Sequence, residues 1–382
     1  NTLTGLGIDD FPVGMLAAGA LLQYLNETQK TELAHFTHII PYLTNKYMLL
    51  DSSTRRNLEL TETLREKQKR GSLLWVLDKT RTAMGGRLLR SMIEQPLIDR
   101  TEMERRLDAI EELNLNSVSR DEIREYLNPV YDLERLLSKV TYKTANPRDF
   151  IAFRNSLEML PHIKTVLKEF SKEELKGIEE DIDGLEDIYQ LICASIEEEP
   201  PVTVREGGMI KDGFDETVDT LRSAKRDGKQ WLAQLEEQDR ERTGIKNLKI
   251  KYNKVFGYYF EVTNSYKNLV PEDYIRKQTL ANAERYTTPR LKELEDTILN
   301  AEDKLTTLEY DLFCKIRDSI AMELERIQST AKALARLDVY ASMSLVSERN
   351  RYVRPKLNEK GVIDIKDGRH PVVEQMIPGD MF

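Results

Sequence analysis

The stretch KNLKIKYNKVFGYYFEVT, residues 246–263, is patterned differently from the sequence around it. Its lysines and apolar residues alternate with period two, which predicts a β-hairpin with one basic and one apolar face. The first strand places Lys249 and Lys251 on the basic face, and a turn at Asn253-Lys254 leads to the second strand. The residues predicted on the apolar face of the second strand are Phe256, Tyr258, Phe260 and Val262.

A third strand is predicted at YIRKQT, with Arg276 and Gln278 on one face and Lys277 and Thr279 on the other. Residues 246–290 carry nine lysines and arginines against four acidic residues, a balance of +5 in a chain whose formal net charge is −9. Basic and amide groups on a small sheet suit backbone phosphates, and no segment here resembles a recognition helix for reading sequence. The alternative is a lysine-coated edge that prevents aggregation.

Two long helices are predicted on either side of this basic segment. The second begins at TTPRL, where Thr288 caps the helix and Pro289 takes its first position. Apolar residues then recur at gaps of three and four: Leu291, Leu294, Ile298, Ala301, Leu305, Leu308 and Leu312. This spacing is typical of a coiled-coil seam, so we predict two antiparallel helices with the basic hairpin at their far end. The expected fold class is mainly α: a multi-helix core, two long antiparallel helices and a small inserted β-rich subdomain.

The rest of the chain predicts further helices. Its most apolar segment, Val13–Leu25, is too short to span a bilayer and is predicted to be a buried core helix. Residues 172–199 are strongly acidic and are expected to form a solvated face. GVIDIKDGRHPVVE, residues 361–374, predicts a strand that opens another domain. Because the first residue is Asn1 and not methionine, we expect a piece of a longer protein.

No catalytic constellation can be assembled from the sequence. VREGGMIKDGFDE, residues 204–216, lacks the Lys-Ser/Thr of a phosphate-binding loop and predicts an ordinary turn with glycines at positive φ. His35 and His38 are three residues apart, but no carboxylate or thiol motif accompanies them, so a structural role is favoured over a metal site. Cys193 and Cys314 are expected to be free thiols of a cytoplasmic protein.

Several segments together resemble one family. TRRNLEL, GSLLWVLDKT and TAMGGRLLRSMIEQPL, within residues 51–97, are similar to segments of MutS, the bacterial DNA mismatch repair family. NKVFGYY and QTLANAERY in the basic segment, and IKDGRHPVVE near the end, resemble the same family. The resemblance covers essentially the whole chain.

The resemblance implies a domain order. Residues 1–12 would be the end of a connector domain, 13–227 the helical core with an ascending lever, 228–290 an inserted clamp, 291–350 the descending lever and return to the core, and 351–382 a truncated start of the ATPase domain. The mismatch-binding domain and the phosphate loop of the family are missing. The chain by itself is therefore expected neither to recognise mismatches nor to act as an enzyme.

The clamp of the resembling family closes over duplex DNA and grips its backbone without reading sequence. The candidate phosphate contacts that the resemblance implies are Lys249, Lys251, Lys254, Arg276, Lys277, Gln278, Thr279 and Asn282. The tyrosines, Phe256 and Phe260 are expected to form the small core behind them. Phe382 falls where the family places an aromatic ring on adenine.

No cofactor or metal is expected in this chain. For the full-length protein the resemblance implies ATP and magnesium, a homodimer and a MutL-type partner, with no membrane association. Two other interpretations stay open: a structural coiled-coil arm without intrinsic DNA binding, and an ATPase whose catalytic domain lies outside this chain. A clamp-less MutS paralogue with an added nuclease is disfavoured by KYNKVFGYYFEVT.

Overall fold

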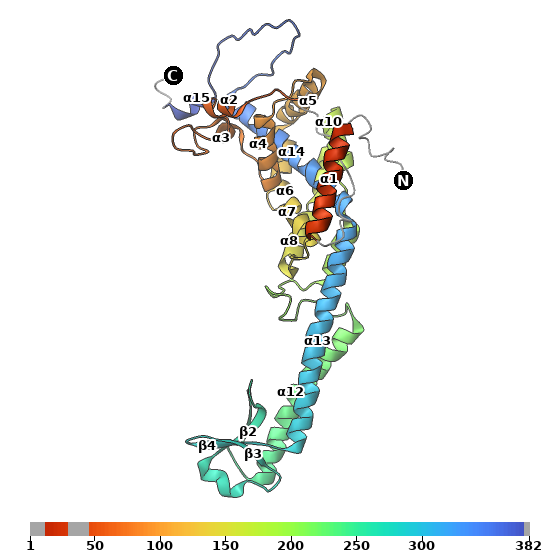
Figure 1. Ribbon diagram of the computed structural model, residues 1–382, viewed down its shortest axis with the longest axis vertical. Helices are drawn as coiled ribbons and strands as arrows, with labels where there is room; N and C mark the ends of the chain where they lie inside the picture. Colours follow the sequence, from red (N-terminus) through yellow and green to blue (C-terminus); the bar gives the residue numbers. More distant parts are fainter. Residues whose placement is uncertain (1–11, 30–45, 378–382) are drawn as a thin grey trace. The chain divides into compact units, whose positions relative to one another are not determined.

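The computed structural model of the chain describes residues 12–29 and 46–377 and divides into two compact units, each treated separately below (Figure 1). The first unit is drawn from residues 1–144, 155–186 and 323–382, and the second from residues 145–154 and 187–322. The expected fold class is confirmed, because helices dominate and the described strands form one small sheet. Within the described ranges, no helix combines the length and apolar character that crossing a membrane requires.

The first unit is built around α14 (Leu324–Asn350), which is buried along much of its length and packs against α3, α4, α5, α6, α7 and α10. The other helices of this unit are α1 (Pro12–Gln29), α2 (Ser52–Asn57), α3 (Leu73–Leu77), α4 (Ala83–Glu94), α5 (Arg100–Leu115), α6 (Ser117–Leu127), α7 (Leu133–Thr141), α9 (Leu160–Leu167), α10 (Glu173–Asp181) and α15 (Val373–Met376). Two further helices, α8 (Pro147–Leu157) and α11 (Glu186–Ser195), cross the sequence boundaries between the units.

A buried carboxylate of α14 fixes the start of α4. Asp338 accepts hydrogen bonds from the backbone nitrogens of Arg81 (2.9 Å) and Thr82 (2.7 Å) and from the Thr82 hydroxyl (2.8 Å). Thr82 caps α4 because its Oγ1 accepts a hydrogen bond from the backbone nitrogen of Gly85 (2.9 Å). A Cβ at Gly85 would lie 2.3 Å from Asp338 Oδ2, so only glycine leaves room for this carboxylate.

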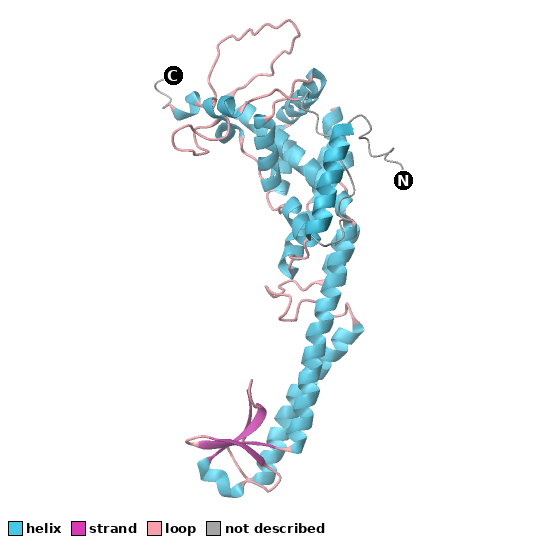
Figure 2. Ribbon diagram, viewed as in Figure 1, coloured by secondary structure: helices cyan, strands magenta, loops and turns pink. Residues whose placement is uncertain are grey.

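The second unit contains the two long helices and the sheet (Figure 2). Its elements are α12 (Glu216–Thr243), β1 (Lys249–Asn253), β2 (Gly257–Thr263), the 3₁₀ helix η2 (Asn264–Leu269), β3 (Ile275–Thr279), β4 (Ala283–Thr287) and α13 (Pro289–Met322). The strands pair antiparallel in the order β1-β2-β4-β3. Thr288 caps α13 by accepting a hydrogen bond from the backbone nitrogen of Leu291 (3.1 Å), and Pro289 is the first helical residue, as predicted.

α12 and α13 pack against each other, and the predicted seam is confirmed along part of its length. The buried members of the seam are Leu291, Ile298, Ala301 and Leu305. The two helices approach closely at Gly228, where a Cβ would lie 2.5 Å from Ile298 Cγ1. Leu308 is only half-buried, because the neighbouring Glu309 takes the fully buried position there.

Replacing Leu305 by alanine is expected to lower the free energy of unfolding of the second unit by about 2–5 kcal/mol, because the side chain is buried between helices and leaves a cavity. Denaturant unfolding followed by Trp231 fluorescence measures this loss. Leu308→Ala is the matched control and should cost less, since Leu308 is half-buried. Equal costs at the two positions would contradict the assigned seam.

The glycine-rich turn before α12 holds a buried carboxylate. Gly207 and Gly208 have φ values of +71° and +76°, which confirms the predicted turn with positive φ. Glu309 of α13 accepts hydrogen bonds from the backbone nitrogens of Gly208 and Met209 and from Arg222 Nη2 (2.7 Å). The turn therefore presents its N–H groups to a side chain of the protein itself.

Two expectations about apolar segments are wrong. The segment Val13–Leu25 does form part of helix α1, but it is not a core helix, since Val13 and Leu16 are exposed by 78% and 76%. The segment from residue 361 forms no strand, and Ile363 is 87% exposed. A strand needs a hydrogen-bonding neighbour, and no described residue pairs with this segment.

The acidic segment is less solvated than expected. Leu175 and Ile178 of α10 are buried. The carboxylates on and after α10 pair with arginines of α14, including Glu174 with Arg336 (3.4 Å). An acidic surface therefore becomes part of the packing of the first unit.

Candidate nucleic-acid interface

The sheet of the second unit has two chemically different faces. In an antiparallel sheet, directly paired residues point to the same side. The pairs Ile250–Phe260 and Phe260–Tyr286 therefore define an inner face. The inner face packs on apolar residues of α12 and α13 in a buried cluster, whose sheet and helix members include Phe260, Val262, Tyr286, Leu232, Leu235, Leu291 and Ile298.

Polar contacts also fix the sheet on α12. The backbone nitrogen of Ile250 donates to Glu236 Oε2 (2.8 Å), and the Tyr274 hydroxyl donates to Asp239 Oδ2 (3.1 Å). Gly244, with φ +72°, ends α12 in the left-handed conformation that commonly closes helices. These contacts tie the sheet to the end of the helix pair.

The outer face carries a connected set of charges. The register pairs Lys249 with Glu261, Lys251 with Tyr259, and Glu261 with Arg285. Lys251 Nζ forms an ion pair with Glu261 Oε1 at 2.7 Å, and this hydrogen bond raises the pKa of Lys251. The Arg285 guanidinium lies over the Tyr259 ring at 4.4 Å. Lys251 is therefore partly neutralised by a neighbour before any ligand binds.

The predicted alternation along β3 is wrong because of a β-bulge at Lys277. Arg276 pairs with Tyr286 and Gln278 pairs with Arg285, so Lys277 is the extra, unpaired residue. After the bulge, Gln278 and Thr279 therefore point to the opposite faces of the sheet from those predicted. Gln278 joins the outer face, where its Oε1 accepts a hydrogen bond from Arg285 Nη1 (2.7 Å).

Arg276 and Thr279 of the edge strand β3 pair with Tyr286 and Glu284, so they lie on the same side of the sheet as the inner face. Arg276 Nη1 lies 3.6 Å from Glu284 Oε1, and Lys267 Nζ lies 2.7 Å from the same oxygen. The hydrogen bond from Lys267 lowers the pKa of Glu284. Burial raises the pKa of Tyr286, which hydrogen-bonds to Glu284, to about 12.

The structure distributes the eight predicted contact residues over several places. Lys249, Lys251 and Gln278 are on the outer face, Arg276 and Thr279 on the other register, Lys254 in the β1–β2 turn, Lys277 at the bulge and Asn282 in the β3–β4 turn. β1 and β3 are opposite edges of the sheet, about 14 Å apart by strand spacing. The residues thus border the sheet and do not form one compact cluster.

Three of these lysines keep their charge available. Lys249, Lys254 and Lys277 are exposed, and within the described part of the chain their ammonium groups have no ion pair or hydrogen bond. An exposed lysine without a carboxylate partner can neutralise a phosphate without first breaking a contact. Of the eight predicted contact residues, these three lysines of the sheet and its β1–β2 turn therefore most readily accept an anion.

The β1–β2 turn includes Phe256, which was predicted to lie on the apolar face of the second strand. Gly257 has φ +73°, and a Cβ there would lie 1.9 Å from Glu295 Oε1 of α13. The backbone nitrogen of Val255 donates to Asn253 Oδ1 (2.8 Å), which closes the turn. Phe256 belongs to this turn and is exposed, so its predicted place in the core is wrong, whereas Phe260 is fully buried as predicted.

Comparisons with known proteins agree with the sequence resemblance. The profile of the family described as MutS domain III matches residues 53–344. The chain belongs to the MutS family. The DNA mismatch repair protein MutS of Lachnoclostridium phytofermentans is 66% identical over 382 residues, all of this chain and 41% of that protein. The protein of the same name from Ruminiclostridium cellulolyticum is 56% identical over 371 residues, 97% of this chain and 42% of that protein. The chain thus spans about two fifths of the length of these MutS relatives.

All eight predicted contact residues lie inside the range matched by the MutS domain III profile. Reasoning from the sequence missed three residues that organise the outer face: Glu261, Arg285 and Tyr259. It also missed β4, which carries Arg285. Little signal for this strand was available, because AERYT, residues 283–287, is short and does not alternate apolar and polar residues.

In the part of this MutS chain that the structure describes, no three histidines, cysteines or carboxylates are grouped so as to hold a metal ion. His35, His38 and Phe382 lie outside the described residues. Cys193 and Cys314 are both free thiols, as predicted.

Proposed function

We propose that this chain serves in DNA mismatch repair as the part of a MutS protein that grips duplex DNA by its backbone and links the bound DNA to the rest of the protein. The observation that carries the proposal is a set of three exposed lysines of a MutS-family chain that have no partner among the described residues: Lys249 and Lys277 on the sheet, and Lys254 in its β1–β2 turn. Relatives at 56–66% identity are named DNA mismatch repair protein MutS.

The chemistry of the sheet supports backbone contact without sequence readout. Lysine ammonium groups bind phosphate as point charges, and phosphate contacts carry no sequence information. The candidate contact residues lie on strands and turns, and none of them is on a helix that could enter the major groove. At the β-bulge, Lys277 has no paired residue on β4. The ion pair of Lys251 with Glu261 is exposed and worth at most about 1 kcal/mol, so a DNA phosphate can take the place of the carboxylate.

The proposal extends to the whole protein of which this chain is a part. That protein would recognise mispaired DNA, bind ATP and magnesium in an ATPase domain, form a homodimer and engage a MutL-type partner in the cytoplasm. By itself the chain would have no ATPase activity. We keep the proposed domain ranges 1–12, 13–227, 228–290, 291–350 and 351–382, although α12 continues without a break through residue 228 to Thr243.

The test is a titration of labelled duplex DNA at several salt concentrations, with fluorescence anisotropy as the readout. The double variant Lys249→Ala/Lys277→Ala is expected to reduce the slope of log K against log salt by about two, since each phosphate contact contributes about 0.9. Binding to matched and mismatched duplexes should weaken equally, because a backbone contact does not sense a mispair.

Two further variants sharpen this test. Lys304→Ala removes an exposed lysine of α13 that has no partner in the described chain, and it should leave the slope unchanged. Glu261→Gln frees Lys251 and should tighten binding by up to about fivefold. An unchanged slope in the double variant would favour the structural arm over DNA contact, and a loss confined to mismatched DNA would also contradict the proposal.

A further inference from the structure

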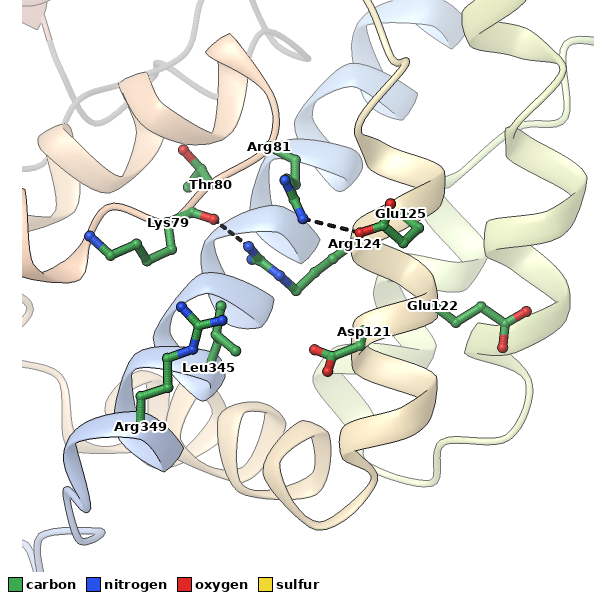
Figure 3. Close-up of a pocket in the computed structure, with 9 residues that line it drawn as sticks. All are labelled: Lys79, Thr80, Arg81, Asp121, Glu122, Arg124, Glu125, Leu345 and Arg349. Atoms are coloured by element: carbon green, nitrogen blue, oxygen red, sulfur yellow. Dashed lines mark hydrogen bonds and ion pairs between the residues drawn. The ribbon is translucent and has the colours of Figure 1, made fainter.

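A pocket in the first unit lies far along the sequence from the sheet and has no role in the proposed DNA contact. It is a cavity of about 740 Å³ formed by the α3–α4 turn, α6 and α14 (Figure 3). Its lining is strongly charged: Lys79, Thr80, Arg81, Asp121, Glu122, Arg124, Glu125, Leu345 and Arg349. The volume is in the range of small-molecule sites, but the lining is charged where such sites are usually mostly apolar, so a ligand here would have to be charged.

Each of the three carboxylates in the lining already has a partner. Asp121 Oδ1 accepts a hydrogen bond from Arg120 Nε (3.0 Å), outside the lining. Glu125 Oε1 accepts from Arg81 Nη2 (3.1 Å), and Glu122 Oε1 accepts from a tyrosine hydroxyl (3.0 Å). The acidic groups are therefore occupied by the protein, which disfavours the pocket as a site for a cation.

Two guanidinium groups of the lining, those of Arg124 and Arg349, have N–H donors without an acceptor among the described residues. Arg124 is 94% buried, and its Nη2 donates to the Lys79 carbonyl (2.7 Å). Its Nη1 is also buried and has no hydrogen-bond partner in the described part of the chain. Arg349 is exposed, and its guanidinium has no partner among the described residues. Figure 3 shows the Arg349 side chain extending along α14 toward Arg124, while Glu122 points away from both.

A buried donor without a partner costs about 1–3 kcal/mol, and more when the group is charged. Burial and then the nearby charge of Arg81 lower the pKa of Arg124, while the carboxylates of Asp338 and Asp121 act in the opposite direction. An anion bound beside Arg124 would give its Nη1 the acceptor that the protein does not supply.

We propose that this pocket binds the phosphate group of a small molecule, with Arg124 and Arg349 as the two guanidinium donors. Guanidinium groups bind phosphate oxygens through paired, charge-assisted hydrogen bonds. Arg81 adds positive charge at the rim and becomes available when its bond to Glu125 opens. Lys79 lines the pocket with its carbonyl beside Arg124, while its Nζ donates to the Trp75 carbonyl (3.1 Å).

The fold holds the pocket in shape before any ligand binds. Ser342 Oγ accepts a hydrogen bond from the backbone nitrogen of Lys79 (2.8 Å) and donates to the Leu77 carbonyl (2.8 Å). Together with Asp338, which accepts hydrogen bonds from the backbone nitrogens of Arg81 and Thr82, this fixes the turn that positions the Lys79 carbonyl against Arg124. A preformed donor geometry lowers the entropic cost of binding.

The test uses the 382-residue chain carrying Lys249→Ala/Lys277→Ala, so that the basic sheet does not contribute. Inorganic phosphate is titrated against chloride at constant ionic strength, with the thermal unfolding midpoint and the ³¹P line width as readouts. Phosphate should raise the midpoint above the chloride baseline. Arg349→Gln, an exposed change, should weaken phosphate binding about tenfold or more without altering the ligand-free midpoint.

Glu125→Gln is the discriminating variant, because it removes a carboxylate and releases Arg81. Phosphate affinity should then increase several-fold, which a merely structural role for these residues does not predict. Adenosine monophosphate, titrated in parallel, distinguishes the source: tighter binding than inorganic phosphate indicates a phosphomonoester ligand, and equal binding indicates free phosphate. No stabilisation of the parent chain by phosphate over chloride, or no effect of either variant, would overturn the proposal. These outcomes are independent of DNA binding.

Discussion

Asp338→Ala is expected to lower the free energy of unfolding of the first unit by about 3–5 kcal/mol, one of the two largest effects that the structure indicates. The carboxylate is fully buried and accepts hydrogen bonds from the backbone nitrogens of Arg81 and Thr82 and from the Thr82 hydroxyl. Alanine leaves these groups without an acceptor inside the protein, at about 1–3 kcal/mol for each that stays buried. It also frees Thr82 to abandon its capping position on α4.

The chain has two tryptophans, Trp75 in the first unit and Trp231 in the second, so each unit can be followed separately. In a Trp231→Phe background, the fluorescence of Trp75 reports denaturant unfolding of the first unit. Asp338→Asn is the matched control, because its amide keeps one acceptor oxygen, and it should cost less than alanine. A loss below about 1 kcal/mol for Asp338→Ala would show that this carboxylate does not hold the turn.

Glu309→Ala is expected to destabilise the second unit by about 3–5 kcal/mol, the range for breaking a buried ion pair. Glu309 is fully buried on α13, forms an ion pair with Arg222 (2.7 Å) and accepts hydrogen bonds from the backbone nitrogens of Gly208 and Met209. Without Glu309, the Arg222 guanidinium keeps only the Asp212 carboxylate and the Ile210 carbonyl as acceptors. The glycine-rich turn also loses these two hydrogen bonds to α13.

Fluorescence of Trp231 in a Trp75→Phe background measures this loss. Glu309→Gln keeps an oxygen for the turn but removes the charge that pairs with Arg222, so the difference between the two variants separates the turn from the ion pair. Arg222→Met combined with Glu309→Leu, which removes both charges, should cost less than Glu309→Ala alone. If the double variant were the worse of the two, the ion pair would be a net source of stability.

The basic character of the candidate site could be predicted from the sequence, but the positions of its side chains could be predicted only in part. The +5 balance of residues 246–290 and the alternation of Lys249 and Lys251 with apolar residues are present in the sequence and predicted a basic sheet. The bulge at Lys277 and the ion pair of Lys251 with Glu261 depend on which strand lies beside which. The phosphate contacts themselves stay a prediction until the salt titration is done.

Local patterns in the sequence were enough to predict several features of this protein: part of the helical seam, the cap at Thr288, the glycine turn and the first two strands. These follow from side-chain periodicity and from capping within a few residues, where neighbours along the chain supply the contacts. Contacts between distant segments account for the rest: Asp338 and Glu309 are buried, residues 361–365 form no strand, and Val13–Leu25 is largely exposed. Burial of a carboxylate depends on donors from distant segments, and a strand depends on a partner, so neither can be read from a local pattern.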